Sequence, residues 1–289
     1  MGDALSRVHV LADAIAVARR SLEEDGEGDV TSEVTVPLDA SGHGLLEVRS
    51  EIVLAGTVYA DAVAAACGLR PVAWCAREGE RLAVGAVAGR IEGRLRELLR
   101  AERSMLNLLQ RACGIATLTR RYTDAVRHTR CRILHTRKTA PGLRLLDISS
   151  VLAGGGEMHR VNLAHTLMVK DNHWRALRAS GRTLAEALAT ARELGVRGLQ
   201  VEVELREQVE EAAAAGATRL LVDNQSPDTV REWGRLARDI SPAIELEATG
   251  GVSLQNVAAY AEAGAEYVSV GALTHSVLAA DISLEVLDA

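Results

Sequence analysis

The sequence predicts an α/β protein in two parts, a small β-rich layer followed by a larger parallel α/β region. Short apolar runs punctuated by glycine fill residues 40–95, and strand-like runs alternate with helical patterns from residue 131 onward. The later runs are apolar almost throughout. Such strands are typical of a parallel sheet that helices cover on both faces.

The first helix is expected over residues 9–24, where apolar residues recur at three- and four-residue intervals. Leu11, Ile15, Ala18 and Leu22 share one face of this helix. An amphipathic helix packs its apolar face onto the core.

A long helix is expected over residues 94–127, with a break near Gly114 because glycine is a poor helix former. This helix connects the two parts of the chain. We therefore expect residues 1–113 to form the amino-terminal part and residues 114–289 to form the parallel α/β part, which carries the site.

Six strand-like runs follow, with helical patterns between the later ones, as in barrel units. The runs cover residues 131–136, 166–170, 199–204, 219–224, 243–248 and 267–271. Polar residues stand at or near their ends: Arg137 and Lys138, Lys170, Glu202 and Glu204, Asp223 and Asn224, Glu247 and Thr249, and Gly271. Surface capping would explain one such strand, but six in series favour an active site at the carboxyl ends of barrel strands.

Composition narrows the function. The net charge is −6, aromatic residues make up 2% of the chain and phenylalanine is absent, so we expect no nucleic-acid binding. The sequence has no signal peptide and no apolar run long enough to cross a membrane. Its four cysteines form no CxxC pair, which favours buried thiols and a cytoplasmic location.

A cationic cluster lies between residues 135 and 173 of this acidic chain. It comprises Arg137, Lys138, Arg144, His159, Arg160, Lys170 and His173. These residues stand beside glycine-rich turns and at the ends of apolar runs. Positive charges held on rigid backbone predict a pocket for a polyanionic small molecule.

Carboxylates and glycine turns complete the predicted site. Glu202 and Asp223 end consecutive strands, where they would hold Mg²⁺ or sugar hydroxyls, or alternatively pair with neighbouring cations. The turns at 248–251 and 269–273 follow the last two strands and are suited to phosphate. Together these features predict an anionic substrate, a phosphorylated sugar and Mg²⁺.

The chain resembles the quinolinate phosphoribosyltransferase family along nearly its whole length. The motifs that carry the resemblance are GDVTSE (28–33), ERSMLNLLQRACGIAT (102–117), TRKTAPGLR (136–144), GGGEMHR (154–160), VKDNH (169–173), VEVE (201–204), LVDN (221–224), EATGGV (247–252) and SVGALTHS (269–276).

The resemblance implies an open α/β barrel of mostly parallel strands with an amino-terminal α/β sandwich domain, in a homodimer or a dimer-based oligomer. It implies an enzyme, a pentosyltransferase that uses Mg²⁺. The reaction would join quinolinate to phosphoribosyl pyrophosphate and release pyrophosphate and carbon dioxide, giving nicotinate mononucleotide for NAD biosynthesis.

The resemblance also implies roles for individual residues. The catalytic residues would be Lys138, Lys170, Glu202 and Asp223. Quinolinate would be bound by Arg137, His159, Arg160 and Lys170, with Arg103 entering from the partner subunit. Mg²⁺ would be held by Glu202 and Asp223, directly or through water or substrate. The 5′-phosphate would be bound by Thr249, Gly250, Gly271 and His275.

Five residues depart from the family pattern near the expected pocket. They are His135, Ile148, Ser149, Met158 and His165. They leave open a phosphoribosyltransferase of the same fold that acts on a different anionic ring acid. A non-catalytic phosphometabolite-binding protein is a further alternative, which the retained Lys138, Glu202 and Asp223 disfavour.

Overall fold

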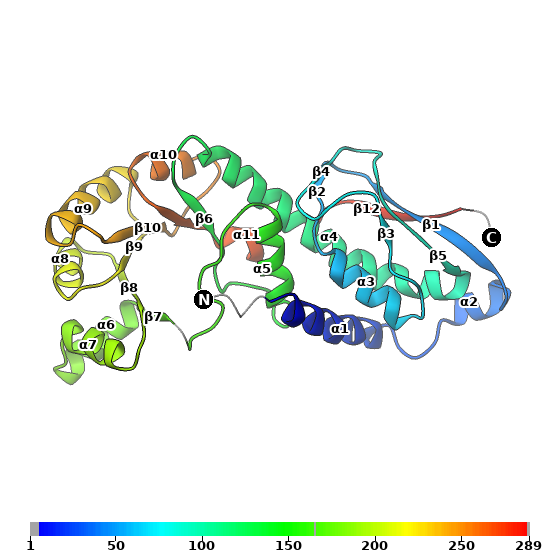
Figure 1. Cartoon of the computed structure of the whole chain (residues 1–289), viewed down its shortest axis with the longest axis horizontal. Helices are drawn as coiled ribbons and strands as arrows, with labels where there is room; N and C mark the ends of the chain where they lie inside the picture. Colours follow the sequence, from blue (N-terminus) through cyan, green and yellow to red (C-terminus); the bar gives the residue numbers. More distant parts are fainter. Residues whose placement is uncertain (1–5, 165, 288–289) are drawn as a thin grey trace. The chain divides into compact units, whose positions relative to one another are not determined.

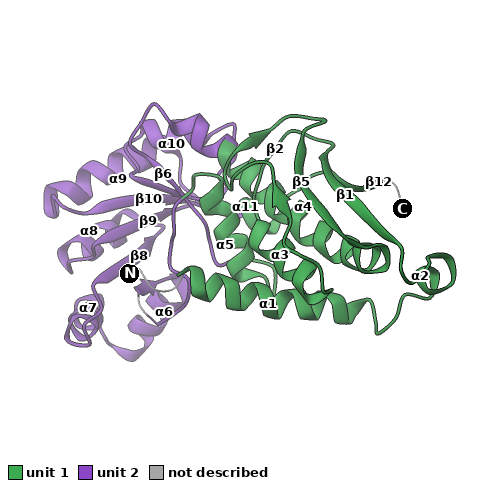
Figure 2. Ribbon diagram, turned by 45° about the vertical axis from the view of Figure 1, so that its right-hand side comes forward, with its two compact units in different colours: residues 1–120, 138–156, 272–289 green, residues 121–137, 157–271 purple. Residues whose placement is uncertain are grey.

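The computed structural model describes residues 6–164 and 166–287, which form two compact units (Figure 2). Unit 1 combines the amino-terminal residues up to Arg120 with residues 138–156 and the carboxy-terminal residues from Ala272. Unit 2 combines residues 121–137 and 157–271. The expected boundary at residue 113 divides the chain once, whereas these units exchange segments several times.

Unit 1 contains a four-stranded antiparallel sheet with the strand order β12-β1-β5-β3 (Figure 1). Its strands are β1 (Ser41–Val48), β3 (Ala73–Trp74), β5 (Val87–Arg94) and β12 (Ile282–Leu287). A separate pair is formed by β2 (Ile52–Val53) and β4 (Arg81–Leu82). These elements realise the short strands expected for residues 40–95.

Helices complete unit 1 and supply much of its core. They are α1 (Arg7–Glu24), α2 (Val30–Thr35), α3 (Thr57–Ala66), α4 (Leu95–Val126, whose last residues belong to unit 2), α5 (Arg144–Ala153) and α11 (Ala272–His275). Apolar residues of α1, α3 and α4 are buried in one core with those of β1 and β5. This helix-on-sheet packing confirms the α/β character expected for the amino-terminal part.

The buried face of α1 differs from the predicted one. Ala18 and Leu22 are buried as expected, but Leu11 is 51% exposed and Ile15 is 42% exposed. Ala14 is fully buried instead. The small side chains of Ala14 and Ala18 let α1 approach α3 closely, which turns the larger Leu11 and Ile15 outward.

The predicted break near Gly114 is wrong, because α4 runs without interruption from Leu95 to Val126. A Cβ atom on Gly114 would lie 2.2 Å from the carbonyl oxygen of Leu278. Glycine is required here because the backbone at Leu278 passes directly against the helix. This close packing outweighs the low helix propensity of glycine.

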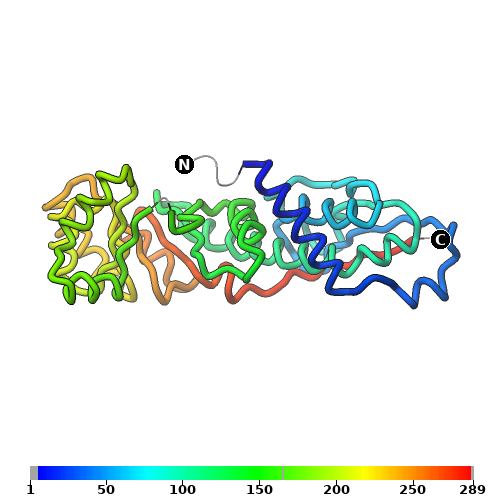
Figure 3. Tube along the Cα trace, turned by 90° about the horizontal axis from the view of Figure 1, so that it is seen from below, coloured from blue at the N-terminus to red at the C-terminus, as the bar shows by residue number. Residues whose placement is uncertain are grey.

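The last strand of the chain belongs to unit 1, although residues 114–289 were expected in the barrel part. β12 pairs antiparallel with β1, with Val48 opposite Ile282 and His43 opposite Leu287. In Figure 3 the red carboxy-terminal trace accordingly runs among the blue and cyan segments. Pairing with β12 covers an edge of β1 that would otherwise expose unpaired backbone groups.

Unit 2 is a six-stranded, fully parallel sheet with the order β6-β11-β10-β9-β8-β7. Its strands are β6 (Arg132–Leu134), β7 (Thr166–Val169), β8 (Gly198–Val203), β9 (Arg219–Asp223), β10 (Glu245–Thr249) and β11 (Tyr267–Ser269). Its other helices are α6 (Asp171–Ser180), α7 (Leu184–Glu193), α8 (Arg206–Ala214), α9 (Pro227–Ile240) and α10 (Val257–Glu262). Within the described residues the edge strands β6 and β7 do not pair with each other, so the sheet does not close and the expected open barrel is confirmed.

Two further sequence expectations concern membrane-spanning helices and the burial of the cysteines. None of the helices in the described ranges is long and apolar enough to span a membrane. All four cysteines are free thiols, but Cys75 is exposed and Cys131 is half-buried, so the expectation of four buried thiols is wrong for these two. Cys75 lies in a surface loop between short strands, where little apolar surface is available to cover it.

Candidate functional site

Three carboxylates meet at the carboxyl ends of β8 and β9. Glu202, Glu204 and Asp223 each offer one oxygen, and these oxygens lie within 4.8 Å of one another. The parallel register places Glu202 beside Leu221, so Glu204 and Asp223 follow at the same end of the sheet. A set of hard oxygen donors fits Mg²⁺. Glu204 was recognised from the sequence only as a strand-end residue.

Lys170, at the end of β7, faces the carboxylate cluster. Its Nζ atom forms a close ion pair with Oε2 of Glu202. The backbone carbonyl of Glu202 accepts a hydrogen bond of 2.9 Å from the indole N–H of Trp174, which ties α6 to this end of β8. The pairing of Glu202 with a neighbouring cation, left open from the sequence, is therefore observed alongside the carboxylate cluster.

A glycine turn after β10 approaches Asp223. Asn224 has a φ of 53° and donates from Nδ2 to Oδ2 of Asp223 at 2.7 Å. Its backbone N–H also donates to the carbonyl of Thr249 at 2.9 Å. Gly250 has a φ of 78°, and a Cβ atom there would lie 2.3 Å from Oδ1 of Asn224. Only glycine fits here, so Thr249 and Gly250 are held beside the carboxylate cluster.

Two arginines of the cationic cluster lie within electrostatic reach of each other in unit 2. Burial lowers the pKa of Arg160, the positive charge of Arg137 lowers it further, and Glu202 and Glu247 act in the opposite direction. Nε of Arg137 is buried and has no hydrogen-bond partner among the described residues. Both guanidinium groups stay charged at neutral pH, so together they form a site for negative charge.

His159 is held by the protein at both ring nitrogens. Its side chain is 6% exposed, and Nε2 lies 3.1 Å from Oε2 of Glu247. Nδ1 accepts the backbone N–H of Arg160 at 2.7 Å. Glu247 is 1% exposed and also accepts from Arg219 at 3.2 Å. Burial alone would raise the pKa of Glu247, but its hydrogen bond to His159 and the positive charge of Arg219 lower it below its ordinary value.

Glu247 was recognised from the sequence only as a strand-end residue, and Arg219 was not singled out. A signal was available in the run AIELEA, where Glu245 and Glu247 alternate with apolar residues on a buried strand. A carboxylate inside a sheet needs a partner. Arg219 pairs with both acids and lies 3.7 Å from the centre of the Tyr267 ring.

Three predicted site residues belong to unit 1. Arg103 on α4 has a side chain that is 63% exposed, and its NH2 lies 3.8 Å from Oε1 of Glu102. The carbonyl of Lys138 accepts the hydroxyl of Thr274 at 2.8 Å. His275, the last residue of α11, is exposed. Unit 2 contains the other predicted residues, including Gly271, which follows β11.

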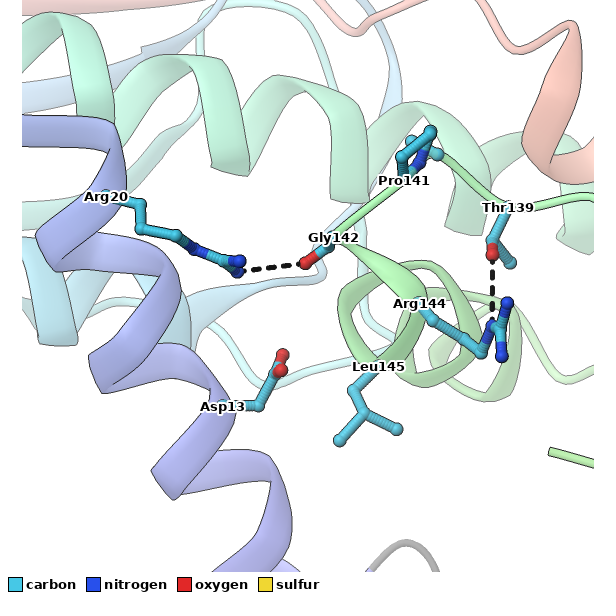
Figure 4. A pocket seen from close by; sticks show the side chains of 8 residues that line it. Asp13, Arg20, Thr139, Pro141, Gly142, Arg144 and Leu145 are labelled. Carbon is cyan, nitrogen blue, oxygen red and sulfur yellow. Dashed lines mark hydrogen bonds between the residues drawn. The ribbon is translucent and has the colours of Figure 1, made fainter. Parts of the chain in front are cut away.

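Arg144 of the cationic cluster lines a cavity formed by unit 1 alone (Figure 4). This cavity has a volume of about 510 Å³ and lies between α1 and the segment from Thr139 to Leu145. Arg20 donates to the carbonyl of Gly142 at 3.1 Å, and Nε of Arg144 lies 3.4 Å from Oγ1 of Thr139. Arg144 thus supports the conformation of the segment that follows Lys138.

Two of the five departures from the family pattern occupy interior positions. Ile148 and His135 are fully buried. Ser149 donates its hydroxyl to the carbonyl of Leu146 within α5, at 2.9 Å. Met158 is half-buried. The fifth position, residue 165, lies outside the described residues.

A parallel barrel with a pair of arginines, a carboxylate cluster and a glycine turn is typical of enzymes that act on phosphorylated sugars. This chain belongs to the quinolinate phosphoribosyl transferase family. The family's N-terminal domain matches residues 29–113, and its C-terminal domain matches residues 115–285.

Named relatives match over most of their length. A carboxylating nicotinate-nucleotide pyrophosphorylase of Mycobacterium leprae is 40% identical over 92% of this chain and 95% of its own. A probable enzyme of the same name from Bacillus subtilis is 38% identical over 92% of this chain and 90% of its own. A solved nicotinate-nucleotide pyrophosphorylase from Francisella tularensis has a TM-score of 0.87 and 29% identity, covering 96% of this chain and 97% of that one.

Proposed function

We propose that this protein transfers the phosphoribosyl group of phosphoribosyl pyrophosphate to quinolinate, with decarboxylation, to give nicotinate mononucleotide, pyrophosphate and carbon dioxide. Family membership and the names of its relatives support this reaction in NAD biosynthesis. The enzyme is thus a pentosyltransferase of the carboxylating nicotinate-nucleotide pyrophosphorylase type.

The observation that carries the proposal is the arrangement of Arg137 and Arg160. The positive charge of Arg137 disfavours the charged form of Arg160, and Nε of Arg137 is buried without a partner among the described residues, so a bound anion would stabilise both guanidinium groups. Quinolinate carries two adjacent carboxylates, and arginine binds carboxylates in a bidentate geometry. Lys170 supplies a third positive charge near Glu202.

The chemistry follows from the charges in the pocket. The pyridine nitrogen attacks the anomeric carbon of the ribose as the bond to pyrophosphate breaks, and positive charge develops on the sugar. Glu202 and Asp223 stabilise that charge, and Lys138 stabilises the pyrophosphate that leaves. The ring nitrogen then carries a positive charge. This charge stabilises the electron pair that stays on C2 when carbon dioxide departs, and C2 is then protonated.

Mg²⁺ fits the carboxylate cluster of Glu202, Glu204 and Asp223 because its three oxygens converge within 4.8 Å of one another. These residues would hold the ion directly or through water or substrate. When bound, Mg²⁺ supplies positive charge that neutralises the phosphate oxygens of the sugar substrate.

We assign the 5′-phosphate to Thr249, Gly250, Gly271 and His275. Gly250 and Gly251 follow β10 and have φ values of 78° and 59°. Because glycine has no side chain, a phosphate can approach the backbone N–H groups of this turn closely. The hydroxyl of Thr249 and the ring of His275 would donate further hydrogen bonds.

We also propose a homodimer in the cytoplasm, in which Arg103 of the partner subunit contributes to each site. The exposed side chain of Arg103 supports this assignment. Val8, Leu11 and Ile15 form an apolar stripe on α1 with exposures of 73%, 51% and 42%. Such a stripe is suited to contact with a second copy.

One experiment tests the reaction. Purified protein is incubated with phosphoribosyl pyrophosphate, Mg²⁺ and either quinolinate or nicotinate, and nicotinate mononucleotide and carbon dioxide are quantified. We expect equal amounts of both products from quinolinate and none from nicotinate. Absence of product from quinolinate would refute the proposal. Product from another ring acid would instead establish the alternative acceptor.

A further inference from the structure

Glu247 contacts the cationic cluster through His159, and the hydrogen bonds of His159 indicate which of its ring nitrogens carries a proton. A backbone N–H can only donate, so Nδ1 of His159, which receives the N–H of Arg160 at 2.7 Å, carries no proton. Nε2 therefore carries the proton of a neutral ring and donates it to Oε2 of Glu247 at 3.1 Å. Neither ring nitrogen is left to bind a substrate carboxylate.

Glu247 is itself fixed. It is 1% exposed, and Arg219 donates to the same Oε2 atom at 3.2 Å. Arg219 is anchored in turn by Glu245 at 2.9 Å and by the ring of Tyr267 at 3.7 Å. The carboxylate is thus held between β9 and His159 with little freedom to move.

We propose that Glu247 is a positioning residue for the quinolinate site: it holds His159 so that Nδ1 fixes the backbone of Arg160 and thereby directs the Arg160 guanidinium beside Arg137. This inference rests on the proposed function, because it assumes that Arg137 and Arg160 bind the dicarboxylate. It also revises the role that the family resemblance implies for His159, from substrate ligand to support of its neighbour.

The chain contains a matched control. Glu245 lies two residues earlier on the same strand, pairs with the same Arg219 and accepts from Tyr267, but within the described ranges it forms no hydrogen bond or ion pair with His159. Glu247→Gln and Glu245→Gln each remove one negative charge from the Arg219 network. Only Glu247→Gln removes the carboxylate that holds the His159 ring.

The test measures quinolinate affinity by calorimetry and the KM for phosphoribosyl pyrophosphate by steady-state kinetics. We expect Glu247→Gln to weaken quinolinate binding about tenfold, a size typical for loss of a group that orients a ligand-binding residue, while the KM for phosphoribosyl pyrophosphate changes less than about twofold. Glu245→Gln should change both values less than about twofold. Equal losses in the two variants would overturn the proposal, since the effect would then come from Arg219.

A second measurement needs no substitution. Long-range ¹⁵N–¹H spectra of the unaltered protein report which nitrogen of each histidine is protonated, and His159→Asn identifies the signal of His159. We expect protonated Nε2 and unprotonated Nδ1, and a proton on Nδ1 would refute the inference. If the unaltered protein shows this pattern but neither binds nor converts quinolinate, the proposed function fails instead, so the two failures are distinguishable.

Discussion

Arg111 and Asp147 join α4 to α5 by a bidentate ion pair with two distances of 2.8 Å. Asp147 is fully buried, and its Oδ2 atom also accepts the backbone N–H of Ala140 at 3.0 Å. Arg111 donates in addition to the carbonyl of Thr274 at 3.0 Å. One ion pair thus fixes the segment that follows Lys138 and the end of the chain near α11.

Asp147→Ala should lower the free energy of unfolding by about 3–5 kcal/mol, because it leaves the charge of Arg111 without its buried partner. Chemical denaturation measures this value. Asp228→Ala is the control, since Asp228 pairs with Arg231 at 2.6 Å but its side chain is 91% exposed. The control should cost less than about 1 kcal/mol. Similar losses in the two variants would show that Asp147 has no special structural role.

Gly114→Ala should destabilise unit 1 by about 1–3 kcal/mol, despite the better helix propensity of alanine. The added Cβ atom would lie 2.2 Å from the carbonyl oxygen of Leu278, which is backbone and cannot move aside alone. Thermal unfolding reports the change. Gly28→Ala serves for comparison, because its Cβ would meet only Oε1 of Glu33 at 3.4 Å. A stabilising effect at Gly114 would contradict the packing described for α4.

Asp61 predicts a pH dependence of stability. Burial raises its pKa above the ordinary value of 3.8, although hydrogen bonds from Val72 and Trp74 act in the opposite direction. The folded state therefore holds the proton more tightly than the unfolded state. This contribution is present below pH 3.8 and is lost as the pH rises through the raised pKa. Asp61→Asn should become more stable relative to the unaltered protein over that window, and an unchanged difference would contradict the assignment.

Glu204 should contribute to Mg²⁺ binding. Glu204→Gln removes one of the three converging carboxylates, so we expect the Mg²⁺ concentration for half-maximal activity to rise about tenfold. The activity at saturating Mg²⁺ should fall less. Glu211→Gln, an exposed position on α8, is the control. An identical Mg²⁺ response in both variants would remove Glu204 from the metal site.

Arg103 provides a test of assembly. Arg103→Ala and Lys138→Ala should each lose most activity alone. Mixing the two chains should restore about a quarter of the activity, because random pairing yields heterodimers that each retain one complete site. Heterodimers confirmed by mass spectrometry but still inactive would show that Arg103 does not act across the subunit boundary.

The sequence predicted much of the fold because the periodicity of apolar residues along the chain is a local signal of helices and strands. Apolar runs of strand length alternate with helical patterns, and the resulting sheet of unit 2 is parallel throughout. The buried face of α1 was only half predicted, since Ile15 and Ala14 are both suitable core residues and the neighbouring helix decides between them. The pairing of β12 with β1 joins residues at opposite ends of the chain, and no local pattern encodes such a partner.

The sequence by itself determined the chemistry available to this protein, because the charged residues at the strand ends and the family motifs are properties of residue type and order. Only the tertiary structure decided which of those groups meet. It brought Glu204 to Glu202 and Asp223, and it placed His159 against Glu247. The reason is that hydrogen bonds and ion pairs depend on distances of a few ångströms between segments far apart in the chain, which packing alone sets.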